Sequence, residues 1–288
     1  MNIESPRGKM PLLAAALLLF LSACQPKVPQ YADLNLSQGE LNWSRFTILS
    51  RRNAELFAPF NAALTVRYQT PDKSYRFDAY FWSNFAPATP YPVRLDILGA
   101  FGAAKAKIFE DQHTFLLYDP ESNSAYAASN SPHAMLKAGI PLPMRLGELA
   151  ALFNGHYQNF FLPGQNEARP ELTSVNDRLE SAYYIASGPL KGELLINSQG
   201  QPVSWIAQRK QDQRNIGWRF EFDYLSGVDA WTLPGPRRIR VAHPDGYSVA
   251  IQIRSLQRLE KPFTPEQLDL ILPSTATIKT AYPDSGAF

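Results

Sequence analysis

Cys24 is the only cysteine among the 288 residues, and it stands where a lipid-modification site is expected. An apolar run from Leu12 to Leu21 comes shortly before it, and the cationic residues Arg7 and Lys9 come before that run. A basic start, an apolar stretch and small residues before a cut are the parts of a secretory signal. A cysteine directly after Leu-Ser-Ala is typical of a bacterial lipoprotein. We therefore expect residues 1–23 to be removed and Cys24 to be acylated.

A membrane-spanning helix is the alternative for this segment. Such a helix needs about 20 apolar residues, whereas Pro11 and the polar Gln25-Pro26-Lys27 bracket a shorter stretch. Two or more acyl chains anchor a protein stably, because each buried methylene contributes about 0.8 kcal/mol. The mature protein is therefore expected to be attached to a membrane without crossing it, with residues 24–42 forming the acylated end and a linker.

Other residues that could do chemistry are scattered along the chain. The four histidines lie in four different segments, with no pair at the spacing of a metal site: His113, His133, His156 and His243. There is no Gly-x-Ser-x-Gly, no phosphate-cradling glycine loop and no carboxylate pair in an apolar setting. Glu110-Asp111 and Asp177 are interpreted as solvated turn residues. The sequence therefore predicts no enzyme, no metal site and no cofactor.

The charge of the mature chain is close to neutral. Loss of Glu4, Arg7 and Lys9 with the signal leaves 26 basic and 25 acidic residues, which argues against nucleic acid as a partner. Local positive charge remains in the second half, at Arg209, Lys210, Arg214, Arg237, Arg238 and Arg240. Such runs are typical of solvated strand edges. The alternative is contact with anionic headgroups or with an acidic surface of a carrier protein.

Alternation of apolar and polar residues with period two dominates the body of the chain. The clearest case places Trp218, Phe220 and Phe222 against Arg219 and Glu221, which predicts a strand with one apolar and one charged face. Recurrent turn signals separate such runs, and we expect about eleven antiparallel strands. A meander of that size must curl or close. The predicted fold class is mainly β, as one incomplete antiparallel barrel.

Helical patterns are confined to a few places. Leu41–Leu56 is predicted to form the first helix, and two short helices are predicted at 132–138 and 145–153, separated by prolines. A last turn is predicted at Thr264-Pro265-Glu266-Gln267, a capping-box arrangement. The mid-chain helices allow two interpretations: they plug one end of an ordinary core, or they form a lid over a ligand site.

The segment 136–155, LKAGIPLPMRLGELAALFNG, resembles a distinctive part of the outer-membrane lipoprotein receptor family LolB. In that family a Gly-x-Pro-x-Pro connection precedes a short amphipathic helix that ends in glycine. Further features follow the family's order: the signal ending at Cys24, the strand Tyr75–Trp82, the strand pair around 94–102, and the later pairing of Gly217-Trp218 with Asp245-Gly246. The resemblance covers about Phe46–Gln257.

The resemblance implies an incomplete barrel with a helical lid, the fold that LolB shares with the periplasmic carrier LolA. It also implies an activity: a monomer accepts acylated lipoproteins from a LolA-like carrier and places them in the outer membrane, without a nucleotide. In well-understood hosts aspartate after the acylated cysteine retains a lipoprotein at the inner membrane, so Gln25 implies the periplasmic face of the outer membrane. The lid would contain Leu136, Ile140, Leu142, Leu146, Leu149, Leu152 and Phe153.

The family's membrane-insertion loop has a counterpart here. LolB carries a projecting leucine in a turn between two early strands, and the matching residue in this chain is Phe101, flanked by Gly99, Ala100 and Gly102. The resemblance implies that this turn inserts into the membrane, with phenylalanine replacing leucine.

A lipoprotein handler must also bury acyl chains. A chain of about 16 carbons in water costs on the order of 12 kcal/mol. A suitable lining is predicted on one face of the strands: Phe77, Phe81, Leu95, Phe115, Leu117, Trp218, Phe220, Phe222, Val249 and Ile251. The alternative is that these side chains pack only against one another.

Two other functions are compatible with such a barrel. The protein could be an anchored sensor or binding module that hands nothing on, or a structural envelope protein with a filled interior. In every case the folded domain is expected at 43–260, followed by a partly disordered extension at 261–288.

Overall fold

The computed structural model describes most of the chain beyond its N-terminal segment. The described residues are 36–56, 58–84, 92–99, 102–129, 134–137, 140, 142–161, 170–186, 191–211, 214–225 and 235–279. The predicted acylation site, Cys24, lies outside them.

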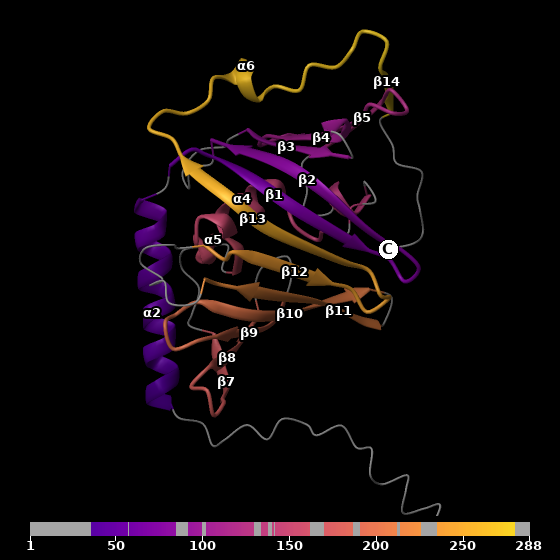
Figure 1. Cartoon of the computed structure of the whole chain (residues 1–288). Coiled ribbons are helices and arrows are strands. Elements are labelled where there is room, and N and C mark those ends of the chain that lie inside the picture. Colours follow the sequence, from indigo (N-terminus) through magenta and orange to yellow (C-terminus); the bar gives the residue numbers. More distant parts are fainter. Residues whose placement is uncertain are drawn as a thin grey trace, which may run out of the picture.

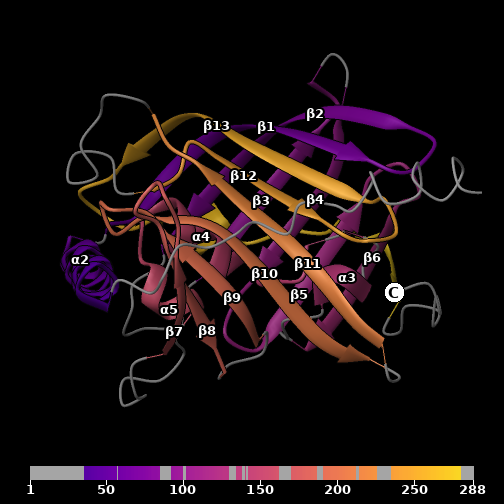
Figure 2. The ribbon, with the colours of Figure 1, turned by 90° about the horizontal axis from the view of Figure 1, so that it is seen from below.

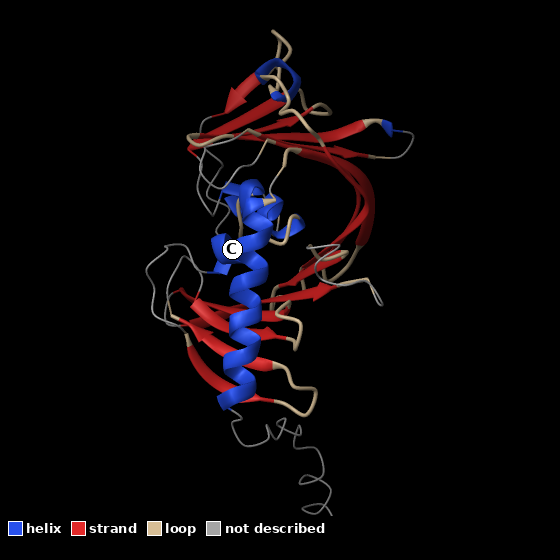
Figure 3. Cartoon of the chain, turned by 90° about the vertical axis from the view of Figure 1, so that its left-hand side faces the viewer, coloured by secondary structure: helices blue, strands red, loops and turns tan. Residues whose placement is uncertain are grey.

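Fourteen strands in this part of the chain form one continuous, strongly curved sheet (Figures 1 and 3). Its order is β14-β6-β5-β4-β3-β2-β1-β13-β12-β11-β10-β9-β8-β7, and only the β14–β6 pair is parallel. The ends of this order, β14 and β7, do not pair with each other, so the sheet is open. The predicted fold class, mainly β with an incomplete antiparallel barrel, is confirmed, with three strands more than the expected eleven.

The strand bounds follow the alternation seen in the sequence. They are β1 (Phe60–Gln69), β2 (Ser74–Ser83), β3 (Val93–Leu98), β4 (Ala104–Glu110), β5 (Thr114–Asp119), β6 (Ser124–Ser129), β7 (Glu171–Val175), β8 (Ser181–Ile185), β9 (Lys191–Ile196), β10 (Pro202–Gln211), β11 (Arg214–Asp223), β12 (Arg238–Ala242), β13 (Ser248–Arg258) and β14 (Thr277–Lys279). On β11, Phe220 and Phe222 are buried while Arg219 is exposed, because successive side chains point to opposite faces.

Helices occupy the inner, concave side of this sheet (Figure 3). They are α2 (Leu36–Glu55), α3 (Ala134–Lys137), α4 (Leu146–Phe153) and α5 (Tyr157–Phe161), and a fifth, α6 (Pro265–Leu268), lies elsewhere. Helix α2 begins at Leu36, whereas the helix in this region was expected to begin at Leu41, and α5 was not expected. The two short mid-chain helices are confirmed as α3 and α4.

Helix α2 closes one end of the curve, over β7, β8 and β9. Figure 2 shows it end-on, with α4 and α5 next to it. Its stripe of Phe46 and Leu49 is fully buried. The Asn42 amide donates to the carbonyl of Leu179 at 2.7 Å and to the Ser181 hydroxyl at 2.8 Å. These contacts hold α2 against the β7–β8 hairpin.

The chain after β13 runs along the outer side of the opposite half of the sheet. The backbone N–H of Phe263 donates to the Asn84 side chain at 2.8 Å, and the Arg94 guanidinium donates to the Asp269 carbonyl at 3.0 Å. Leu270 packs with Tyr118 and Ala125 in a small cluster on that side. The predicted capping box at Thr264 is confirmed, since its N–H donates to the Gln267 side chain at 2.8 Å. The segment then ends in β14 beside β6.

No helix among the described residues has the length and apolar character needed to cross a bilayer.

Candidate functional site

The concave face collects the ten side chains predicted to line an acyl-binding cavity. They come from β2, β3, β5, β11 and β13, and all point toward the helices rather than outward. Nine of them are buried in one core, and Phe77, near the open end of β2, is half-buried. The sheet therefore presents a continuous apolar inner surface built from strands far apart in the sequence.

Helix α4 lies on this surface with almost no exposed side. Phe153 sits edge-on to Phe81 at 5.3 Å and to Phe60 at 6.4 Å between ring centroids. Leu146, Leu149 and other α4 residues are also buried. Six of the seven predicted lid residues are buried in the same core, and the seventh, Ile140, is half-buried against it.

Helix α5 supplies further aromatic contacts that the sequence analysis missed. Phe160 and Phe161 each pack edge-on to Trp205 at 5.2 Å. They also reach Phe220 at 6.0 Å and Phe222 at 6.1 Å, respectively. The signal was present in the spacing of Tyr157, Phe160 and Phe161, which places three aromatic rings on one helical face.

The apolar surface of the sheet is thus covered by the protein's own helices. Edge-to-face ring pairs each contribute about 0.5–1.5 kcal/mol beyond the area they bury. A hydrocarbon chain could reach the inner aromatics only if α4 and α5 moved away from them, so this structure is the closed form of any such site.

A buried carboxylate holds the start of α4, and here the sequence interpretation was wrong. Glu110 is the last residue of β4, is only 3% exposed, and is not a solvated turn residue. Its oxygens accept hydrogen bonds from the backbone N–H groups of Leu146 at 2.8 Å and Gly147 at 3.1 Å. The positive end of the helix dipole favours an anion at this position.

Burial and hydrogen bonding act on Glu110 in opposite directions. Burial raises the pKa of its carboxyl, the two N–H groups of α4 lower it, and the result is a pKa of about 7. Desolvation is the larger effect, because the charged form has lost its water. The carboxyl therefore changes charge near neutral pH while it touches the helix.

The other end of the helical pair is tied to α2. The Asn53 amide donates to the Gly155 carbonyl at 3.0 Å, and the Ser50 hydroxyl accepts from the Gln158 N–H at 2.8 Å. On the α5 side, the hydroxyls of Tyr157 and Tyr224 lie 3.1 Å apart, and burial raises the pKa of both phenols. Both tyrosines therefore stay neutral over the physiological range.

The predicted membrane-insertion loop falls in the β3–β4 turn. The Gly99 N–H donates to the Ala103 carbonyl at 2.7 Å, and the Gly102 N–H donates to the Gly99 carbonyl at 3.3 Å. Gly102 has φ of +78°, a conformation that glycine adopts without strain. Ala100 and Phe101, at the tip, lie outside the described residues.

Within the described ranges, no three His, Cys, Asp or Glu side chains are grouped so that they could hold a metal ion.

Comparison with known proteins identifies the fold. No protein-family model and no curated protein sequence matches the chain. Among solved structures, a domain described as an outer membrane lipoprotein-sorting protein domain from Vibrio parahaemolyticus superposes with a TM-score of 0.50 at 8% identity, over 78% of this chain and 94% of that one. The chain therefore shares the fold of that domain. A LolA superfamily protein from Nitrosomonas europaea is also similar, with a TM-score of 0.47 at 16% identity, covering 77% of this chain and 98% of that protein.

The likeness to that domain extends over most of both chains. At these identities the likeness extends to architecture alone, so the role of the inner face in this protein rests on its own residues.

Proposed function

We propose that the protein is an outer-membrane lipoprotein, anchored through Cys24 on the periplasmic side, that receives lipoproteins from a LolA-like carrier and inserts them into that membrane. The observation that carries the proposal is the apolar inner face covered by α4 and α5. In this proposal an acyl chain binds between the sheet and the displaced helices.

The exchange is physically plausible because one hydrocarbon surface replaces another. An acyl chain of about 16 carbons gains on the order of 12 kcal/mol by leaving water. The rings of Phe153, Phe160 and Phe161 occupy the sheet surface in the closed form. When α4 and α5 move away from the sheet, the acyl chain takes the place of their rings on the sheet aromatics. The inner face of the sheet therefore need not become exposed to water.

Two sets of hydrogen bonds would resist the movement of α4 and α5 away from the sheet. Glu110 ties the first turn of α4 to β4 through two hydrogen bonds, and Asn53 and Ser50 tie the start of α5 to α2. All of these bonds join side chains to backbone groups of α4, of α5 or of the turn between them. They can be broken and remade without rearranging the apolar contacts within the sheet.

The decisive experiment is a transfer assay. The mature chain with Cys24→Ala, which has no anchor, is mixed with a carrier loaded with a radiolabelled lipoprotein and with liposomes. We expect the label to move to the liposomes faster than with carrier alone. Binding of the cargo without delivery would identify a sensor or binding module instead, and no cargo binding at all would contradict the proposal.

The location of the acyl chain can be tested by fluorescence. A fatty acid brominated along its chain quenches tryptophans that it touches, and Trp205 lies among the rings of α5 on the inner face. We expect Trp205→Phe to remove much of the quenching. Trp82→Phe is the matched control, because Trp82 lies on the outer face beside Tyr80 and Arg94. Equal quenching of the two variants would place the chain elsewhere.

The β3–β4 turn is proposed to insert into the membrane. Phe101→Ala should leave the free energy of unfolding in urea unchanged within about 0.5 kcal/mol, as expected for a turn substitution. It should reduce delivery in the transfer assay at least several-fold. Normal delivery by a folded Phe101→Ala variant would remove the loop from the proposal.

A further inference from the structure

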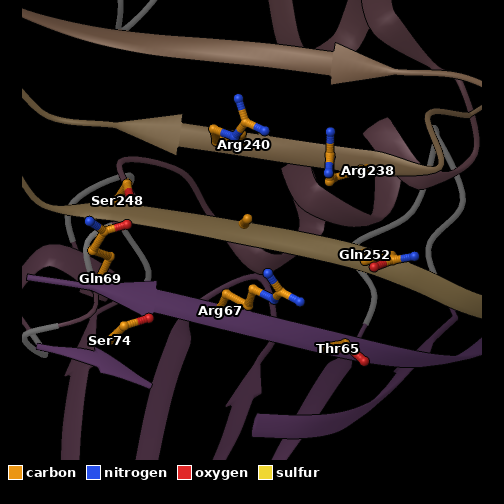
Figure 4. A pocket seen from close by; sticks show the side chains of 9 residues that line it. Thr65, Arg67, Gln69, Ser74, Arg238, Arg240, Ser248 and Gln252 are labelled. Carbon is orange, nitrogen blue, oxygen red and sulfur yellow. The ribbon is translucent and has the colours of Figure 1, made fainter. Parts of the chain in front are cut away.

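A hollow lies on the outer face of the sheet, on the side opposite α4 and α5. Its volume is about 310 Å³, within the range of small-molecule sites. Nine residues of β1, β2, β12 and β13 line it (Figure 4): Thr65, Arg67, Gln69, Ser74, Arg238, Arg240, Ser248, Ala250 and Gln252.

The hollow exists because the short side chain of Ala250 lies between two arginines on the neighbouring strands. Ala250 on β13 is in register with Arg240 on β12 and with Arg67 on β1. Its methyl group leaves open space between the two arginines. Ser248 and Gln252, two residues away on the same strand, point to the same face and border this space.

The arginines around the hollow are not equivalent. Arg240 donates to Glu221 at 2.5 Å and Arg238 donates to Asp223 at 2.6 Å, so both lean toward β11. Figure 4 shows the Arg67 guanidinium between β1 and β13, on the side of the hollow. Within the described part of the chain no hydrogen bond or ion pair holds Arg67.

Arg67 also faces a like charge. It is directly opposite Arg76 on β2, which likewise has no hydrogen bond or ion pair among the described residues. Like charges opposite each other destabilise a sheet. The nearest carboxylate on β2, Asp78, is in contact with Arg254 at 3.5 Å. Arg67 therefore borders the polar hollow with a second arginine opposite it on the neighbouring strand, and neither is paired with a carboxylate among the described residues.

We propose that this hollow binds a phosphate ester that also carries hydroxyl groups. The guanidinium fork of Arg67 matches the geometry of phosphate oxygens, and an anion there would relieve the repulsion between Arg67 and Arg76. The hydroxyls of Thr65, Ser74 and Ser248 and the amides of Gln69 and Gln252 supply partners for hydroxyl groups. The same chemistry occurs in an anionic lipid headgroup and in a free phosphorylated polyol.

Binding in this hollow would not depend on acyl-chain transfer, because the hollow and the proposed acyl site lie on opposite faces of the sheet. The mature chain with Cys24→Ala is titrated with glycerol 3-phosphate by calorimetry at low salt. In a second arm it is floated with vesicles of phosphatidylglycerol or of phosphatidylcholine. Binding of the soluble ester identifies a free polyol phosphate, whereas binding only to phosphatidylglycerol vesicles identifies a headgroup.

Three variants decide whether the hollow is responsible. In whichever arm binds, Arg67→Gln should weaken binding at least tenfold, and Ala250→Leu should do the same by filling the space while keeping every charge. Arg178→Gln, in the exposed turn between β7 and β8, is the matched control and should bind like the parent.

Circular dichroism confirms that each variant is folded, and Arg67→Lys, which keeps the charge but loses the fork, should be intermediate. The proposal is overturned if neither arm shows binding, or if Arg67→Gln and Ala250→Leu bind as tightly as Arg178→Gln.

Discussion

The two faces of the central strands differ in chemistry and in how they are covered. On the inner face of β13, Val249, Ile251 and Ile253 are buried under helices. On its outer face, Ser248, Ala250 and Gln252 line an open hollow. The same strand thus presents an apolar surface that is filled by the protein itself and a polar surface that is left unfilled. Substitutions on the inner face should therefore change stability, whereas those on the outer face should change binding.

The largest effect is expected inside. Phe153→Ala removes a ring that packs on Phe60 and Phe81 and should lower the free energy of unfolding by about 3–5 kcal/mol. Urea unfolding followed by circular dichroism measures the loss. Ile206→Ala, on the outer face of β10 and 37% exposed, is the control and should cost less than about 1 kcal/mol. Similar losses for the two variants would mean that α4 does not pack as described.

The next effect is a dependence on pH. The pKa of Glu110 is raised from its ordinary value of 4.5 to about 7 in the folded state. The folded protein therefore binds this proton more tightly, and the stability it contributes is complete below pH 4.5 and lost as the pH rises to about 7. The loss amounts to up to about 3 kcal/mol. Glu110→Gln should remove it, measured as the difference in unfolding free energy from the parent at each pH.

A buried histidine masks this effect in the parent. Burial lowers the pKa of His156 from 6.5 to about 4. Its contribution is therefore complete above pH 6.5 and is lost as the pH falls toward 4, opposite in sign to that of Glu110. Stability of Glu110→Gln should accordingly rise with pH between 4 and 6.5 more steeply than that of the parent. Parallel pH curves for the two proteins would show that Glu110 does not titrate in this range.

The smallest effect is expected on the outer face. Arg238 pairs with Asp223 while its side chain is 44% exposed, and exposed pairs contribute about 0–1 kcal/mol that salt screens. Arg238→Gln should therefore lower the unfolding free energy by less than 1 kcal/mol, and by less still at high salt. A loss of unfolding free energy above about 2 kcal/mol would mean that side chains of the outer face also contribute substantially to stability.

Much of the fold could be predicted from local sequence. The alternation around Trp218 and Phe222 determines which residues of β11 face inward. The same alternation on the other strands places all ten predicted lining residues on one face of the sheet. Prolines 141 and 143 likewise indicate that α3 and α4 are separate helices. These features depend on neighbours within a few residues, so the sequence contains enough information to predict them.

Features that depend on distant partners could not be predicted in the same way. Glu110 followed by Asp111 has the composition of a solvated turn, and only the N–H groups of Leu146 and Gly147, more than thirty residues later, explain its burial. Arg67 and Arg240 are widely separated in sequence and border the same hollow only because Ala250 pairs with both. The predicted cavity lining gave no indication that α5 would fill the space.

The parallel strand β14 bears on how the molecule behaves at high protein concentration. It pairs with the free side of β6 through residues 277–279, which are all exposed. Without β14, β6 would be an uncovered edge strand, and such a strand is a template for pairing with another polypeptide. β14 replaces this six-residue edge by one of only three residues, and a short edge is a poorer template. Cutting the chain before Thr277 would expose the longer edge of β6 to neighbouring copies.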